Sequence, residues 1–156
     1  MVIEDRRLRA NERPTLYIFS AWLLVSVILI ATGAPQILAG EYHGPDDALR
    51  MVQVRDLVAG QPWYDLHQYR ITPPDGTRMH WSRLVDAPIA AFILFFSLFL
   101  DGPIAERAAM IVTPLSALLL TMLALGRLTW RLFDRNMAAL TCLVLMLLPL
   151  LSLIHI

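Results

Sequence analysis

The sequence predicts an all-α, polytopic membrane protein with about four transmembrane helices and an ordered outer loop that bears interfacial helices. Two observations predict this fold class. Of the 156 residues, 57% are hydrophobic and only 17% are charged, whereas an ordinary globular chain is roughly 45–50% apolar and about 25% charged. The apolar residues also form four separate blocks, and a spanning helix needs about 20 such residues because the hydrocarbon core is roughly 30 Å thick.

Charge and cysteine content exclude several other classes of protein. Thirteen basic and thirteen acidic residues cancel to a net charge of zero, whereas a nucleic-acid-binding protein carries a basic excess. The single cysteine, Cys142, excludes an intramolecular disulfide and any metal cluster built from cysteines alone. We therefore expect the lipid bilayer as a partner and no nucleic acid.

The first apolar block, residues 15–38, contains no charged residue and measures about 36 Å as a helix. Tyr17 and Trp22 lie near its start, where aromatic side chains suit the membrane interface. Because a signal peptide has an apolar run of only about 7–15 residues, an uncleaved first transmembrane helix is the better interpretation. The tail 1–14 is expected to be cytoplasmic by the positive-inside rule. Its arginines are Arg6, Arg7, Arg9 and Arg13.

Three further apolar blocks follow, at residues 85–100, 108–126 and 137–156, and they predict the second, third and fourth transmembrane helices. The block 85–100 is short and contains Asp86, so it either crosses the membrane or re-enters it from one side. If it crosses, the arginine-bearing connection 127–136 lies outside, against the positive-inside rule; if it re-enters, that connection is cytoplasmic. The orientation of 127–136 therefore stays open on these grounds.

The segment between the first two blocks, 39–84, is the one long polar stretch and is expected to lie outside the membrane. It holds five arginines, six acidic residues and three of the four histidines. A polar loop of this length is usually functional or disordered, and its tryptophans, tyrosines and helical pattern favour order. Apolar residues at helical spacing predict an interfacial helix over 46–59, ended by Gly60. These residues are Ala48, Met51, Val54 and Val58.

Two adjacent acids, Asp46 and Asp47, open this helix and allow two interpretations. In the first, Asp46 is the N-cap and pairs with Arg50 at i+4, while Asp47 is a first-turn acid that suits the helix dipole. In the second, their place just beyond the outer end of the first span makes them catalytic: a carboxylate there can act as general base on an acceptor, or hold a divalent metal. A divalent metal is thus one option for a cofactor, although no ligand set is assigned.

Three arginines in the second half of the loop, Arg70, Arg78 and Arg83, are candidates for binding a phosphate or pyrophosphate. Their planar guanidinium groups pair with phosphate through two hydrogen bonds. The alternative is that each contacts lipid headgroups on an interfacial segment. We expect Arg70 and Arg83 to bind the substrate.

Other polar side chains near the second block also have two interpretations. His67 and His80 are candidate metal ligands or proton shuttles, although a single histidine in a polar loop is more often neither. His80 joins Arg70 and Arg83 as an expected substrate-binding residue. Asp86 is costly if buried in the membrane, and it either pairs with Arg83 at i−3 or serves function.

Four features follow one another along the chain. They are an arginine-bearing tail before a single span; Asp46-Asp47 opening an outer helix that ends with Gly60-Gln61-Pro62-Trp63; Asp86-Ala87-Pro88 after an aromatic and basic segment; and Gly126-Arg127 followed by Arg131-Leu132-Phe133-Asp134-Arg135. In this order they resemble the N-terminal part of the C-type superfamily of membrane glycosyltransferases, which includes the protein O-mannosyltransferase and aminoarabinose-transferase families. The resemblance covers about residues 8–150.

The resemblance implies a helical enzyme of the bacterial inner (plasma) membrane that moves a sugar from a polyprenyl-phosphate donor to an acceptor in the cell envelope. It favours four spans and a cytoplasmic N-terminus. The usual catalytic base or metal contact of the superfamily is an acid in the first outer loop, and this role carries over to Asp46 or Asp47. Competing hypotheses are a non-catalytic membrane scaffold that uses the loop as a partner surface, and a transporter component.

Full members of this superfamily have many more spans, so we expect this chain to be a fragment without activity of its own. The C-terminal residues 151–156, Leu-Ser-Leu-Ile-His-Ile, match the translation of CTG TCT CTT ATA CAC ATC, which resembles the transposase adaptor end of sequencing libraries. We interpret these six residues as adaptor read-through, so that 137–150 would be the natural part of the fourth span.

Overall fold

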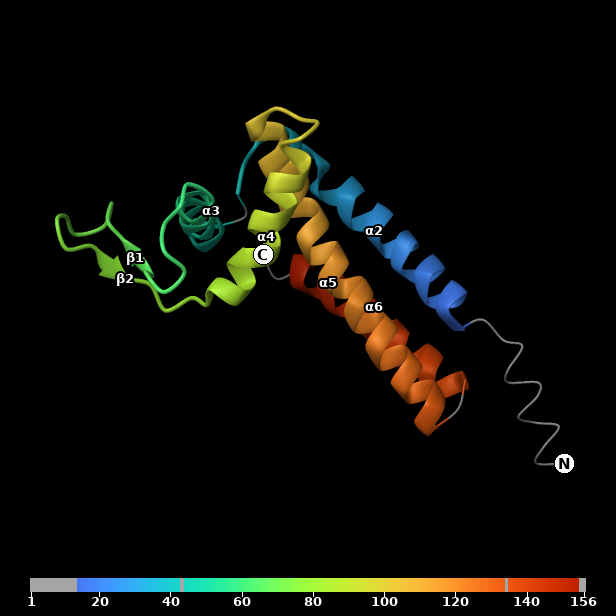
Figure 1. The fold of residues 1–156 in the computed structure, drawn as a ribbon. Coiled ribbons are helices and arrows are strands. Elements are labelled where there is room, and N and C mark those ends of the chain that lie inside the picture. The colour runs from blue at the N-terminus through green and yellow to red at the C-terminus, as the bar shows by residue number, and fades with distance from the viewer. Residues whose placement is uncertain (1–13, 43, 134, 155–156) are drawn as a thin grey trace, which may run out of the picture. The chain divides into compact units, whose positions relative to one another are not determined.

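The computed structural model describes residues 14–42, 44–133 and 135–154, and these residues are mostly helical (Figure 1). The arginines of the tail and the last two residues of the chain lie outside the described residues. The elements in order are α2 (Pro14–Ala39), α3 (Pro45–Val58), β1 (His67–Gln68), β2 (Thr77–Arg78), α4 (Arg83–Phe96), α5 (Gly102–Leu132) and α6 (Arg135–Ile154).

Two helices of the described chain are long and apolar enough to cross a membrane: Thr15–Gly33 within α2, and α5. The helical class is therefore confirmed, whereas four spans are not shown. The block expected at 85–100 forms α4, which has 14 residues and is shorter than the roughly 20 that a spanning helix requires. The block expected at 108–126 lies inside the 31-residue α5, which begins earlier, at Gly102.

The contacts divide the chain into two compact units, which are described separately. The helical unit comprises the described parts of Met1–Thr32 and Leu115–Ile156, and the loop unit comprises Gly33–Pro114. Helices α2 and α5 each contribute residues to both units.

The core of the helical unit consists of three buried side chains, Ile18 of α2, Met122 of α5 and Cys142 of α6. The indole Nε1 of Trp22 donates a hydrogen bond of 2.8 Å to the carbonyl oxygen of Leu115. Thus Trp22, expected at the membrane interface, contacts a neighbouring helix. Cys142 packs in this core.

Gly126 lies close to side chains of α2 and α6, and its replacement by leucine is expected to destabilise the helical packing. A Cβ atom there would lie 2.8 Å from Cδ1 of Ile18 and 3.1 Å from Sγ of Cys142, and overpacking a core costs about 1–3 kcal/mol. Thermal unfolding in detergent micelles, followed by circular dichroism, should show a lower midpoint. Gly102→Leu is the matched control, since nothing lies within 4 Å of that position; equal shifts in both variants would contradict the close packing.

The loop unit is built on the packing of α3 against α4. Met51 and Val54 of α3, Ala90 and Ile93 of α4, and Ala109 of α5 form one buried cluster. The two short strands pair antiparallel, with His67 opposite Arg78 and Gln68 opposite Thr77. The loop is therefore ordered, as expected, and it contains a β-hairpin that the helical pattern did not predict.

Helix α3 is the helix expected over 46–59, with two differences in detail. Its N-cap is Gly44 without a side-chain cap, and Pro45 follows in the first turn, where the missing N–H of proline has no cost. The interpretation of Asp46 as the N-cap is therefore wrong. Along the apolar stripe, Met51 and Val54 are buried, but Val58 is 39% exposed because Leu57 packs on the cluster instead.

Candidate functional site

Asp46 and Asp47 lie in the first turn of α3, and both are exposed. A carboxylate in this position is stabilised by the partial positive charge of the helix N-terminus. Neither makes a side-chain hydrogen bond or ion pair with a described residue. By contrast, Asp56, Asp65 and Asp86 are each engaged by an arginine or a histidine. The two expected catalytic carboxylates are therefore adjacent and open to a ligand.

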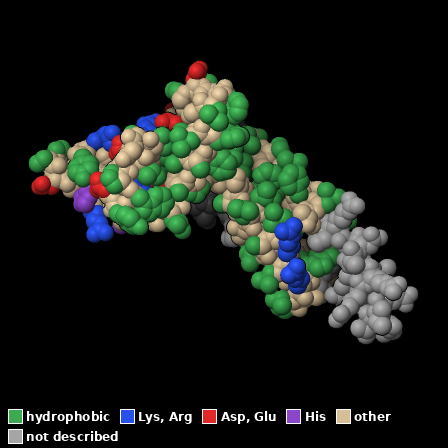
Figure 2. Space-filling view, in the orientation of Figure 1, with side chains coloured by type: hydrophobic (Ala, Val, Ile, Leu, Met, Phe, Trp, Pro, Cys, Tyr) green, Lys and Arg blue, Asp and Glu red, His purple; other side chains and the backbone are tan. Residues whose placement is uncertain are grey.

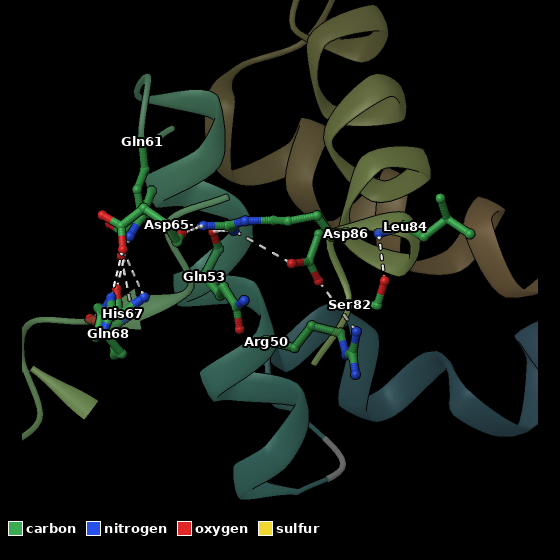
Figure 3. A network of polar contacts seen from close by, with 11 residues as sticks. Arg50, Gln53, Gln61, Asp65, His67, Gln68, Ser82, Leu84 and Asp86 are labelled. Atoms are coloured by element: carbon green, nitrogen blue, oxygen red, sulfur yellow. Dashed lines mark hydrogen bonds and ion pairs between the residues drawn. The ribbon is translucent and has the colours of Figure 1, made fainter. Parts of the chain in front are cut away.

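The expected pairing of Asp46 with Arg50 is absent from the structure. Arg50 instead donates from Nη1 to Oδ1 of Asp86, 3.3 Å away, and its guanidinium lies 4.8 Å from the ring centre of Trp81. Figure 3 shows Arg50 on α3 and Asp86 on α4 pointing toward one another. The reason is geometric. Asp86 on the neighbouring helix α4 is a buried partner, and Trp81, just before α4, adds an aromatic face, whereas Asp46 is exposed.

Arg83, an expected substrate-binding residue, is buried at the centre of a polar network, with its side chain only 2% exposed. Its Nη1 donates to the carbonyl oxygen of Gln53 at 3.1 Å. Its Nη2 donates to Oε1 of Gln61 at 2.8 Å and to the carbonyl oxygen of Asp65 at 2.7 Å. Arg83 thus ties α4 to the end of α3 and to the segment after it. The role that the structure shows for this guanidinium is structural.

Asp86 completes this network. Its side chain is fully buried, and Oδ2 lies 3.5 Å from Nη1 of Arg83, so the i, i+3 pair, one of the two interpretations of Asp86, is present. Because Arg50 pairs with the other carboxylate oxygen, two guanidinium groups share one buried carboxylate. Sequence reasoning missed the buried Gln53, whose side-chain amide atoms have no hydrogen-bond partner among the described residues.

Arg70, the second expected substrate-binding arginine, is largely exposed but already has a partner. Its Nη1 and Nη2 donate to the two carboxylate oxygens of Asp56 at 2.7 and 3.0 Å, and Nη1 also reaches Oε1 of Gln68 at 2.9 Å. The guanidinium of Arg70, hydrogen-bonded to this carboxylate, lowers the pKa of Asp56. Sequence reasoning did not single out Asp56, because fourteen residues separate it from Arg70.

The remaining expected residues lie on the exposed hairpin and the segment after it. Arg78 on β2 and His80 are exposed, and the ring of His80 lies 5.4 Å from that of Trp81. Figure 2 shows acidic, basic and histidine side chains gathered over this part of the loop unit. His80 therefore remains accessible to a ligand.

Asp65 organises a small cluster with His67 and Tyr69. One carboxylate oxygen accepts from the backbone N–H of His67 at 3.0 Å and lies 2.9 Å from its ring Nδ1; the other accepts from the Tyr69 hydroxyl at 3.0 Å. These hydrogen bonds, the backbone one first, lower the pKa of Asp65 to about 2. The same contact raises the pKa of Tyr69.

Comparison with known proteins finds no family model that matches this chain, and no curated protein or solved structure that is significantly similar to it. Within the described ranges, no three or more histidine, cysteine or acidic side chains are grouped so that they could hold a metal ion.

The Asp65 cluster predicts an acid-sensitive loop. Because the pKa of Asp65 in the folded protein, about 2, lies below the roughly 3.9 of an unfolded chain, its hydrogen bonds stabilise the fold above about pH 4. That contribution is lost as the pH falls toward 2. We expect the NMR shift of the His67 amide proton to titrate in this window and Asp65→Asn to abolish the titration. Asp75→Asn is the control, and a titration that survives Asp65→Asn would contradict the assignment.

Proposed function

We propose that this chain is the N-terminal part of a membrane glycosyltransferase that transfers a sugar from a polyprenyl-phosphate donor to an acceptor of the cell envelope. One observation carries the proposal. Asp46 and Asp47 are adjacent, exposed and unpaired among the described residues, on the first turn of an ordered helix that follows the apolar helix α2. The order of motifs along the chain supports the same assignment.

The chemistry assigned to this pair is the activation of an acceptor hydroxyl or amine. One carboxylate accepts the proton as the acceptor atom attacks the anomeric carbon; the bond from that carbon to the donor phosphate breaks, and polyprenyl phosphate leaves. The second carboxylate orients the acceptor. If the full-length enzyme uses a divalent metal, Asp46 and Asp47 would be the residues that hold it, and it would supply charge stabilisation. The proposed contacts of the donor phosphate are His80, which is exposed, and Arg70, which is exposed but would have to exchange its hydrogen bonds to Asp56 for the phosphate, while Arg83 positions the loop.

The proposal places the protein in the bacterial inner membrane with a cytoplasmic N-terminus. Apolar helices α2 and α5 support membrane association. The second candidate, a non-catalytic scaffold, is favoured by exposed aromatic side chains in the loop, where Tyr64 is 92% exposed and Trp63 45%. Aromatic side chains of this kind are enriched at protein interfaces and at membrane interfaces alike.

A turnover assay separates these functions. The full-length gene product, recovered by sequencing downstream of this segment, is reconstituted with a lipid extract of its own host membrane, and free polyprenyl phosphate is measured. Time-dependent release above a protein-free control supports the glycosyltransferase. Absence of release, together with a stable protein complex captured through the loop, would favour the scaffold and overturn the enzyme.

A further inference from the structure

In the helical unit, α2 and α5 run antiparallel. Their contacts occur in reverse sequence order: Thr15 accepts a hydrogen bond from Arg127, Ile18 contacts Gly126, and Trp22 bonds to Leu115. The start of α2 therefore lies beside the end of α5. Two helices packed in this way cross a bilayer in opposite directions.

In the loop unit, the end of α2 lies beside the start of α5. Gly40, directly after α2, is so close to Arg107 that a Cβ atom there would lie 2.7 Å from Nη2 of the arginine. The connection that leaves α2 and the segment that begins α5 are therefore neighbours. They lie on one side of the membrane, which is the outer side if the N-terminal tail is cytoplasmic.

Helix α3 holds the chain on both sides of α4. Asp86, in the first turn of α4, binds Arg50 of α3. Glu106, in α5 after α4 has ended, binds Arg55 of α3 through two hydrogen bonds of 2.8 and 2.6 Å. Arg50 and Arg55 are about 1.4 turns apart, which is about 7.5 Å along the axis of α3. The chain therefore contacts α3 both at the start of α4 and after α4 has ended. A segment that crosses a membrane of about 30 Å would end on the opposite side and could not return to α3.

The free side of α4 is nevertheless apolar. Leu94 and Phe95 are more than half exposed, and Leu98 and Phe99, in the turn after the helix, are each 73% exposed. Water disfavours such a surface, because exposed leucine and phenylalanine side chains are more stable when they are buried in an apolar medium. With spanning helices on either side in the sequence, the apolar medium at hand is the acyl-chain region of the bilayer.

We propose that α4 and the apolar turn 97–100 insert into the outer leaflet without crossing it, so that α2 and α5 are the crossing helices on either side of it in the sequence. The second of the four expected spans is then a re-entrant segment. The arginine-bearing connection between α5 and α6 lies on the same side as the N-terminal tail, in agreement with the positive-inside rule. This inference rests on the membrane location in the proposed function and not on its chemistry.

Cysteine labelling in the full chain tests the topology. In a Cys142→Ala background, single cysteines replace the exposed residues Asp101 and Leu132, and Asp75→Cys serves as the outer reference. Intact spheroplasts are treated with a membrane-impermeant maleimide before and after permeabilisation. We expect Asp101→Cys to label in intact cells, although more slowly than Asp75→Cys because it adjoins the inserted turn, and Leu132→Cys to label only after permeabilisation. Labelling of Asp101→Cys only from the cytoplasmic side would overturn the proposal.

Spin labels at Phe95 and Leu98 test the lipid contact. In reconstituted vesicles, relaxation of both labels by oxygen should exceed relaxation by a water-soluble nickel complex at least several-fold, with the reverse at Asp75. Higher relaxation by the nickel complex would place α4 in water, and low relaxation by both reagents would show protein covering it; either result overturns the insertion. Extraction with alkaline carbonate tests the membrane location on which this inference rests. If carbonate releases the chain from membranes, the proposed membrane location is wrong, whatever the cysteine labelling shows.

Discussion

Replacement of Asp86 by alanine is expected to destabilise the loop unit by about 3 kcal/mol, the largest stability effect of any single substitution considered. Removal of one partner from a buried ion pair costs about 3–5 kcal/mol because the remaining charge stays buried and uncompensated. Here the remaining charge is that of Arg83, whose side chain is 2% exposed. The lower end applies because Arg83 also donates to three neutral oxygens.

The measurement is chemical unfolding in detergent micelles, followed by tryptophan fluorescence in a Trp22→Phe, Trp130→Phe background that leaves Trp63 and Trp81 of the loop unit as the fluorophores. Asp75→Ala is the matched control, since this acid is exposed in a turn, and it should shift stability by less than about 0.5 kcal/mol. The double variant Arg83→Met, Asp86→Leu should recover part of the loss, because it removes both charges together. An Asp86→Ala variant as stable as the control would show that the network does not hold α4 to α3.

Replacement of Asp46 and Asp47 by asparagine is expected to reduce sugar transfer by the full-length protein by about 10²–10⁴-fold for the residue that acts as base, the usual contribution of general-base catalysis. Asparagine keeps the size of the side chain but cannot accept the proton. Since both side chains are exposed and unpaired among the described residues, stability should change little. A loss of turnover with an unchanged unfolding midpoint would separate catalysis from folding.

The assay measures release of polyprenyl phosphate by each single variant and by the double variant. Asp75→Asn, in the same loop, is the control and should retain full turnover. If one variant loses kcat while the other raises KM, the first residue is the base and the second positions the acceptor. Unchanged turnover in both single variants and in the double variant would remove both residues from the mechanism.

Helix α3 shows how much of the structure the local sequence pattern predicts. Its apolar positions predicted the helix to within one residue at each end, and two of them, Met51 and Val54, are buried as expected. The cap was wrong, because Gly44 and Pro45 begin the helix before the acids. The β-hairpin escaped prediction because strands of two residues are too short to show an alternating pattern.

In the candidate site, too, local features could be predicted from the sequence and long-range contacts could not. Asp46 and Asp47 could be found from the sequence because their position at a helix start is a local property. The fate of the arginines could not be found, since Arg50 binds a carboxylate 36 residues away and Arg83 binds oxygens 18, 22 and 30 residues away. No spacing rule within one helix reaches such partners.

The sequence by itself determined the helical class, the apolar character of α2 and α5 and the helix α3, and it offered the pair of Arg83 with Asp86 at i+3 as one of two interpretations. Each of these follows from residues within a few turns of one another, where helix geometry sets the distance. Only the tertiary structure decided that Arg83 is buried and that the chain returns to α3 after α4. Such contacts depend on how separate helices pack, and the packing is set by long-range burial that periodicity does not record.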